Sequence, residues 1–146
     1  MKIRSNINIQ INGEPPVEIC NQIKSCALNM LRDSLKGTVT DSQIKYLAWG
    51  SSSTANNAAQ TTLVAEFGRV QVTTQTAGAT GIVVTVTYVP PDTGNTPKIE
   101  ELGWFAGAAA TGTANTGILV GRVLYSHQKT IYEAIQITRT DTFTEV

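Results

Sequence analysis

The feature that most constrains the fold is a strict alternation of side chains near the N-terminus. From Ile3 to Ile11, every odd position except Ser5 is isoleucine, and every even position is polar. Successive side chains of a β-strand point to opposite faces, so this pattern predicts a half-buried strand. Residues 1–12 then either join the sheet as a strand or form an N-terminal arm that adds to a sheet edge of a neighbouring subunit.

A second segment has the spacing of an amphipathic helix. Pro15 and Pro16 precede it, and Gly37 follows it as a C-terminal cap. We expect one helix of about five turns that starts near Val17. Its apolar positions are Ile19, Ile23, Ala27, Met30, Leu31 and Leu35.

The two cysteines of the chain, Cys20 and Cys26, fall within this expected helix. Six residues turn a helix by about 600°, which leaves the two side chains on different faces. We therefore expect two reduced thiols and no disulfide between them.

The patterns in the remainder of the chain predict mainly strands. Val or Ile alternates with Thr or Gln on both sides of Ala77–Gly81, and this pattern predicts a hairpin. The small residues over 106–116 predict a flexible loop. A short helix is expected from Ala58 to Phe67. The expected strands cover 44–49, 70–76, 82–89, 98–105, 118–125 and 131–140. We predict a single domain, 1–146, that is mainly β (α+β): an antiparallel β-sandwich or barrel-like sheet with one N-terminal amphipathic helix.

Charge argues against several partners. The chain has 11 basic and 11 acidic residues, so its formal net charge is zero, and charged residues make up 15% of the chain against a norm of about 25%. Nucleic-acid binding normally needs a basic excess, so we expect no nucleic-acid partner. Apolar stretches end well short of the ~20 residues of a membrane helix, so we expect no membrane partner. A neutral, Thr-rich surface suits a protein that is covered by other protein.

The sequence contains no convergent catalytic or metal-binding set. His127 is the only histidine, so no Cys/His zinc site can be assembled. Ser126 and His127, like Glu100 and Glu101, are neighbours on an expected strand and point to opposite faces. We expect no enzyme activity, no cofactor and no metal, unless a site is shared between subunits.

Three stretches, taken together, resemble the N-terminal domain of tail-fibre proteins from tailed bacteriophages. The first is Gly50 with its loop of small residues, followed by a Leu-x-x-Glu-x-x-Arg motif. The second is similar to the Ile-x-Glu-x-Gly-Leu-Phe/Tyr motif of that family, with Trp104 in place of an aliphatic residue. The third is a strand that leads to a Lys, over Leu119 to Lys129. The matching motif residues are Leu63, Glu66, Arg69, Glu101, Gly103 and Phe105.

This resemblance implies a non-enzymatic structural protein of a tailed-phage virion, assembled in the host cytoplasm. It favours a homotrimeric tail-fibre-base or baseplate-associated docking module whose partners are other virion proteins: baseplate, fibre or major capsid protein. The alternative is a trimeric capsid decoration (cement) protein that stabilises the phage head. A host-glycan-binding module is disfavoured, because the chain lacks a suitable acid pair and has few aromatic residues.

The matched residues have a structural interpretation. The planar guanidinium of Arg69 can bind a carboxylate through two hydrogen bonds, and Glu66 and Glu101 are its candidate partners. We expect these three to form a partly buried ionic cluster that ties the short helix to the sheet. The alternative is a solvated ion pair worth under ~1 kcal/mol. Gly50 and Gly103 are expected at a turn or at a close backbone approach.

A subunit interface is expected at apolar residues of two strands. Trp104 and Phe105 are neighbours, so one faces the core and the other can face a neighbouring subunit, where aromatic residues are enriched. The isoleucines of the N-terminal strand complete the candidate interface: Ile3, Ile7 and Ile9.

Overall fold

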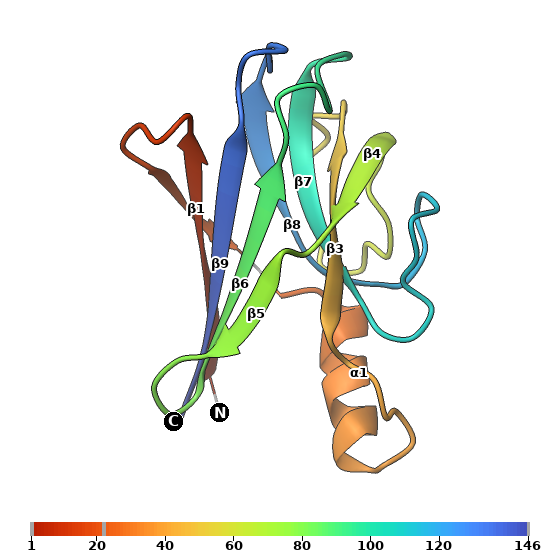
Figure 1. Cartoon of the computed structure of the whole chain (residues 1–146). Coiled ribbons are helices and arrows are strands. Elements are labelled where there is room, and N and C mark those ends of the chain that lie inside the picture. Colours follow the sequence, from red (N-terminus) through yellow and green to blue (C-terminus); the bar gives the residue numbers. More distant parts are fainter. Residues whose placement is uncertain (1, 22, 146) are drawn as a thin grey trace.

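Two antiparallel sheets and one helix make up the computed structural model, which describes residues 2–21 and 23–145 (Figure 1). The expected mainly β sandwich with one N-terminal helix is confirmed. The elements are β1 (Lys2–Ile11), β2 (Val17–Asn21), α1 (Ser25–Leu35), β3 (Ile44–Gly50), β4 (Glu66–Gln71), β5 (Thr74–Ala77), β6 (Ile82–Val89), β7 (Ile99–Ala106), β8 (Ile118–His127) and β9 (Ile135–Thr144).

The hydrophobic core lies between the two sheets. Sheet A has the strand order β2-β1-β9-β6-β5, and sheet B has the order β4-β3-β7-β8. The isoleucines of β1 alternate as the sequence predicts: Ile7 and Ile9 are buried, whereas Asn6 and Asn8 are exposed. Sheet B contributes Trp104 and other apolar residues to the same core. Helix α1 packs against β8 at one end of the sandwich (Figure 1).

Both sides of the sandwich are linked, which gives it a partly barrel-like outline. On one side the chain passes from β4 in sheet B to β5 in sheet A within a few residues (Figure 1). The predicted strand over 70–76 therefore spans this bend and belongs to both sheets. On the other side an isolated bridge pairs Ile23 with Gly121 of β8.

The helix is shorter than the sequence predicts, and this expectation was wrong at its start. Val17–Asn21 forms β2, which pairs antiparallel with β1 and places Ile19 opposite Ile7. Extended pairing satisfies the backbone groups along an open edge of β1, and this gain outweighs the local helical spacing. Cys20 is consequently exposed on β2 while Cys26 lies in α1, and both are free thiols.

The end of the helix agrees with the sequence. Gly37 has a positive φ of 77°, which suits a residue without a Cβ atom. The Gly37 amide donates to the Ser34 carbonyl, and the Thr38 amide donates to the Asp33 carbonyl. These two bonds satisfy carbonyls that the last helical turn leaves open.

Of the two alternatives for the N-terminal segment, the described residues 2–11 form the strand: β1 pairs with β2 on one side and with β9 on the other within the same chain. One further expectation needs correction. The short helix expected from Ala58 to Phe67 is absent: residues 58–65 are irregular, and β4 begins at Glu66. Among the described residues, no helix has the length and apolar character that a membrane span requires.

Candidate functional site

The residues predicted for the ionic cluster and for the close approaches gather on the outer face of sheet B, which points away from sheet A. They come from β3, β4 and β7, which are neighbours in the sheet. The register gives two adjacent rows across these strands: Glu66, Gly50 and Glu101 in the first, and Arg69, Ala48 and Gly103 in the second.

A β-bulge brings Glu66 and Arg69 to the same face of β4. Residues three apart on a regular strand point in opposite directions. Here the pairing with β3 shifts between Trp49 and Gly50, which leaves Phe67 as an extra residue. The predicted proximity of Glu66 and Arg69 therefore arises in a bulged strand and not in the expected helix.

Arg69 and Glu66 form a buried ion pair. Their side chains are 3% and 0% exposed, and the Arg69 Nε atom lies 2.6 Å from Glu66 Oε1. A second bond joins Arg69 Nη2 to Glu66 Oε2 at 3.1 Å. The guanidinium carbon also lies 4.4 Å from the centre of the Phe105 ring, which adds a cation–π contact.

The same pair anchors the loop between β7 and β8. Arg69 Nη1 donates to the carbonyls of Thr111 and Thr116, at 2.8 and 3.1 Å. The Asn115 amide donates to Glu66 Oε2 at 2.8 Å. The loop of small residues predicted over 106–116 thus has three points of attachment to β4.

Glu101 binds a different arginine from the one the sequence suggested. Arg122 Nε lies 2.5 Å from Glu101 Oε2, and both side chains are fully buried. Arg122 lies opposite Gly103 across the β7–β8 ladder, whereas β3 separates Glu101 from Arg69. The predicted three-residue cluster is therefore divided into two ion pairs, Glu66–Arg69 and Glu101–Arg122.

The Glu101–Arg122 pair holds the long loop over residues 51–65. Glu101 accepts hydrogen bonds from the amides of Val64 and Ala65, at 3.2 and 2.8 Å. Arg122 Nη1 donates to the Thr54 carbonyl at 2.8 Å. One ion pair thus fixes both ends of a loop that has no regular secondary structure of its own.

Lys24 adds a third buried charge to this loop. Its side chain is fully buried, and Nζ donates to Asn56 Oδ1, the Asn57 carbonyl and Gln60 Oε1 at 2.9–3.2 Å. Burial, together with the nearby Arg122 guanidinium, lowers the pKa of Lys24 below its ordinary 10.5. No sequence pattern indicates this role, because Lys24 follows a strand whose apolar spacing predicts a helix.

Lys129 holds another loop in the same manner. It is 1% exposed, and Nζ donates to the Pro91 carbonyl at 2.7 Å and to Asn95 Oδ1 at 3.1 Å. Burial lowers the pKa of Lys129 as well. Buried cations therefore anchor the loops at 51–65, 90–97 and 107–117.

Gly50 and Gly103 allow the loops to lie flat on the sheet. A Cβ atom on Gly50 would overlap the Glu101 carboxylate and lie 2.7 Å from the Ala65 carbonyl oxygen. A Cβ atom on Gly103 would lie 2.6 Å from the Leu63 side chain. A second small core forms above the glycines: Ala48, Leu63, Phe105, Ala110 and Leu119.

The expected subunit interface does not fit the positions of its residues. Ile7, Ile9 and Trp104 are buried between the sheets, at 0–1% exposure. Phe105 faces outward from sheet B, as the alternation requires, but Arg69 and the small outer core cover it. Only Ile3 is partly exposed.

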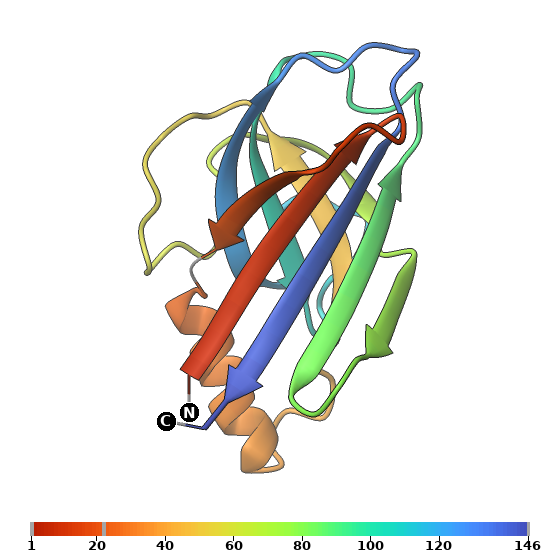
Figure 2. The same cartoon turned by 90° about the vertical axis from the view of Figure 1, so that its left-hand side faces the viewer.

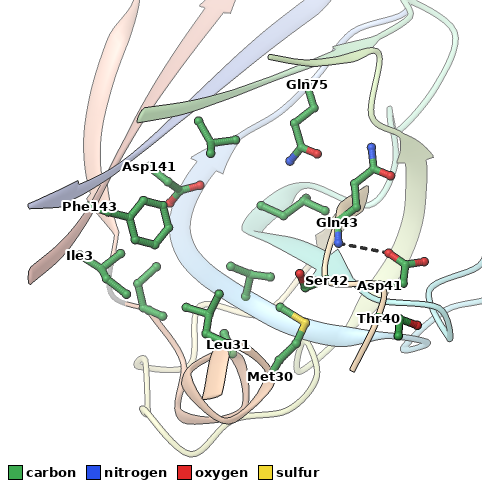
Figure 3. Close-up of a pocket in the computed structure, with 15 residues that line it drawn as sticks. Ile3, Met30, Leu31, Thr40, Asp41, Ser42, Gln43, Gln75, Asp141 and Phe143 are labelled. Atoms are coloured by element: carbon green, nitrogen blue, oxygen red, sulfur yellow. Dashed lines mark hydrogen bonds between the residues drawn. The ribbon is translucent and has the colours of Figure 1, made fainter. Parts of the chain in front are cut away.

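Ile3 lines a groove of about 550 Å³ between sheet A, α1 and the segment before β3 (Figure 3). Its walls are mostly apolar, and the carboxylate of Asp141 points into it. That carboxylate already accepts hydrogen bonds from Ser5 and, at 2.8 Å, from Arg139. The charge of Asp141 is therefore balanced within the fold.

Comparison with known proteins gives no relative: no family model, no curated protein and no solved structure matches the chain. Within the described part of the chain, no group of three His, Cys, Asp or Glu side chains is placed to hold a metal ion. The site residues are thus understood from their contacts, which attach loops to the outer face of sheet B.

Replacing Gly50 with Ala should destabilise the fold by about 1–3 kcal/mol, because the new methyl group overlaps a buried carboxylate and a backbone oxygen. Gly112→Ala is the matched control, since a Cβ atom there has no neighbour within 4 Å. Urea unfolding of both variants measures the difference. Equal stability of the two variants would contradict the close approach at Gly50.

Replacing Arg122 with Met should destabilise the fold by about 3–5 kcal/mol, because it leaves Glu101 buried without its cation. Arg32→Ala is the control, since Arg32 is mostly exposed in its pair with Asp33 and its loss should leave the melting temperature unchanged. A thermal melt of Arg122→Met that matches the wild type would refute the assigned role of the pair.

The contribution of Lys24 to the free energy of unfolding should increase with pH in the alkaline range. Its pKa is lower in the folded chain, so the unfolded chain binds more protons between that lowered pKa and 10.5. The free energy of unfolding therefore gains a rising contribution across this interval. Lys24→Met should lose that rise, as measured by urea unfolding of both proteins from pH 7 to 10.5. An identical pH dependence of the two proteins would contradict the lowered pKa of Lys24 in the folded chain.

Proposed function

We propose that the chain is a non-enzymatic structural protein of a tailed-phage virion. In this proposal it is a tail-fibre-base or baseplate-associated docking module that works as a homotrimer. Other virion proteins are its partners, and its place of assembly is the host cytoplasm.

The observation that carries this proposal is the gathering of the motif residues. The residues that match the first two tail-fibre motifs are spread over more than fifty residues, from Gly50 to Phe105. All of their members lie on or against one face of sheet B, where two buried ion pairs hold two loops. Motifs that serve one local architecture support a common origin with the family they resemble.

The anchored loops at 51–65 and 107–117 are the docking surface that we assign. Loops carry binding functions most often when a rigid scaffold positions them. Here the scaffold contacts are buried cations and carboxylates, which limit the motion of long, irregular segments before any partner binds. A loop that is ordered in advance loses less conformational entropy on docking.

Immunogold labelling of intact phage particles with an antibody to this chain tests the proposal. We expect gold at the tail tip or baseplate, and particles grown without the gene give the background. Gold over the head would replace the tail assignment with the capsid decoration alternative. Particles free of gold, with the chain present in infected cells, would overturn a virion role altogether.

A further inference from the structure

The outer face of sheet A is broad and uncovered. Figure 2 views this sheet face on, and no other segment of the chain crosses in front of it. Residues that alternate with the buried ones form this face, so Asn6 and Asn8 of β1 and Thr138 and Thr140 of β9 point outward. Outer side chains of β6 lie beside the threonines and form an apolar stripe: Val84, Val86 and Tyr88.

The charges on this face lie at its margins. Lys2 and Arg4 are at one end of β1, and Glu18 is on the edge strand β2. The centre consists of amides, hydroxyls and the apolar stripe. Exposed sheets of proteins that stay monomeric usually carry Lys or Glu across the face. In this chain eight of the 22 charged side chains are buried, so little charge remains for the surface.

The face has the area that a stable interface needs. The five strands contain 37 residues, and each residue covers about 3.4 Å by 4.8 Å of the sheet, which gives roughly 600 Å² in projection. A standard interface covers about 800 Å² of accessible surface on each partner. Side chains add relief, and the accessible area of the face therefore falls in this class.

We propose that a second copy of this chain packs on the outer face of sheet A, with the stripe of Val84, Val86 and Tyr88 near the middle of the contact. This inference rests on the self-association in the proposed function and adds the surface that makes it. Identical copies bring like residues together near their symmetry axis, which requires an uncharged centre. Opposite charges at the margin allow Arg4 of one copy to face Glu18 of the other.

A charge placed at the centre of the face tests this surface. Thr140 lies between Asn6 of β1 and Val84 of β6. Thr140→Glu and Thr140→Lys should each weaken self-association by about 100-fold or more, because either charge is buried without a partner. Gln71→Glu is the matched control, since Gln71 is exposed on β4 of the other sheet. Native mass spectrometry across a concentration series measures the association, and circular dichroism checks that each variant folds.

Cys20 provides an independent readout, because it lies in the same row of the face, opposite Asn6. In the wild-type assembly its alkylation should be slow, and in Thr140→Glu it should proceed at the rate of an exposed thiol. Equal rates in the two proteins would contradict the proposed surface.

The outcomes separate this inference from the proposed function. A wild-type oligomer that both Thr140 variants dissociate, and Gln71→Glu does not, supports the surface. A wild-type oligomer that persists in folded Thr140 variants overturns the surface and leaves the proposed function in place. A wild-type monomer at all concentrations overturns both the surface and the homotrimer.

Discussion

The buried ion pair between Glu101 and Arg122 is the interaction on which the outer face of sheet B depends. Its two members lie on neighbouring strands, and each also binds the backbone of the loop over residues 51–65. A buried ion pair need not stabilise a fold relative to an apolar pair, yet removal of one partner is costly. The pair therefore specifies where the loop lies more than it adds to the total stability.

The same principle explains how a chain with few charges uses them. Arg69, Lys24 and Lys129 each donate to a backbone carbonyl oxygen of an irregular segment. A cation with several donors can satisfy oxygen atoms that no secondary structure reaches. Charges that anchor loops inside the molecule are then missing from its surface. The burial of charged side chains under the loops thus explains both the order of these loops and the small number of charges on the surface.

The sequence predicted elements whose signal is local. The alternation from Ile3 to Ile11 is sufficient to define β1, and Gly37 marks the end of α1 because the chain there adopts a left-handed conformation. The apolar spacing of Val17–Asn21 fits a helix locally and therefore predicts one. Its strand pairing depends on β1, and a local pattern does not contain that information.

The site was predicted in part for the same reason. Glu66 and Arg69 are close in sequence, so their pairing could be anticipated even though a bulge produces it. Glu101 and Arg122 are 21 residues apart and meet through the β7–β8 register. That register includes two irregularities, which spacing along the chain does not reveal.

Hydrogen–deuterium exchange of Glu101→Gln tests this account most directly. The variant keeps the shape of the side chain and removes the charge that the amides of Val64 and Ala65 contact. We predict faster exchange throughout residues 51–65, with β1 and β9 protected as in the wild type. Unchanged protection of the Val64 and Ala65 amides would contradict the central role of the buried pair.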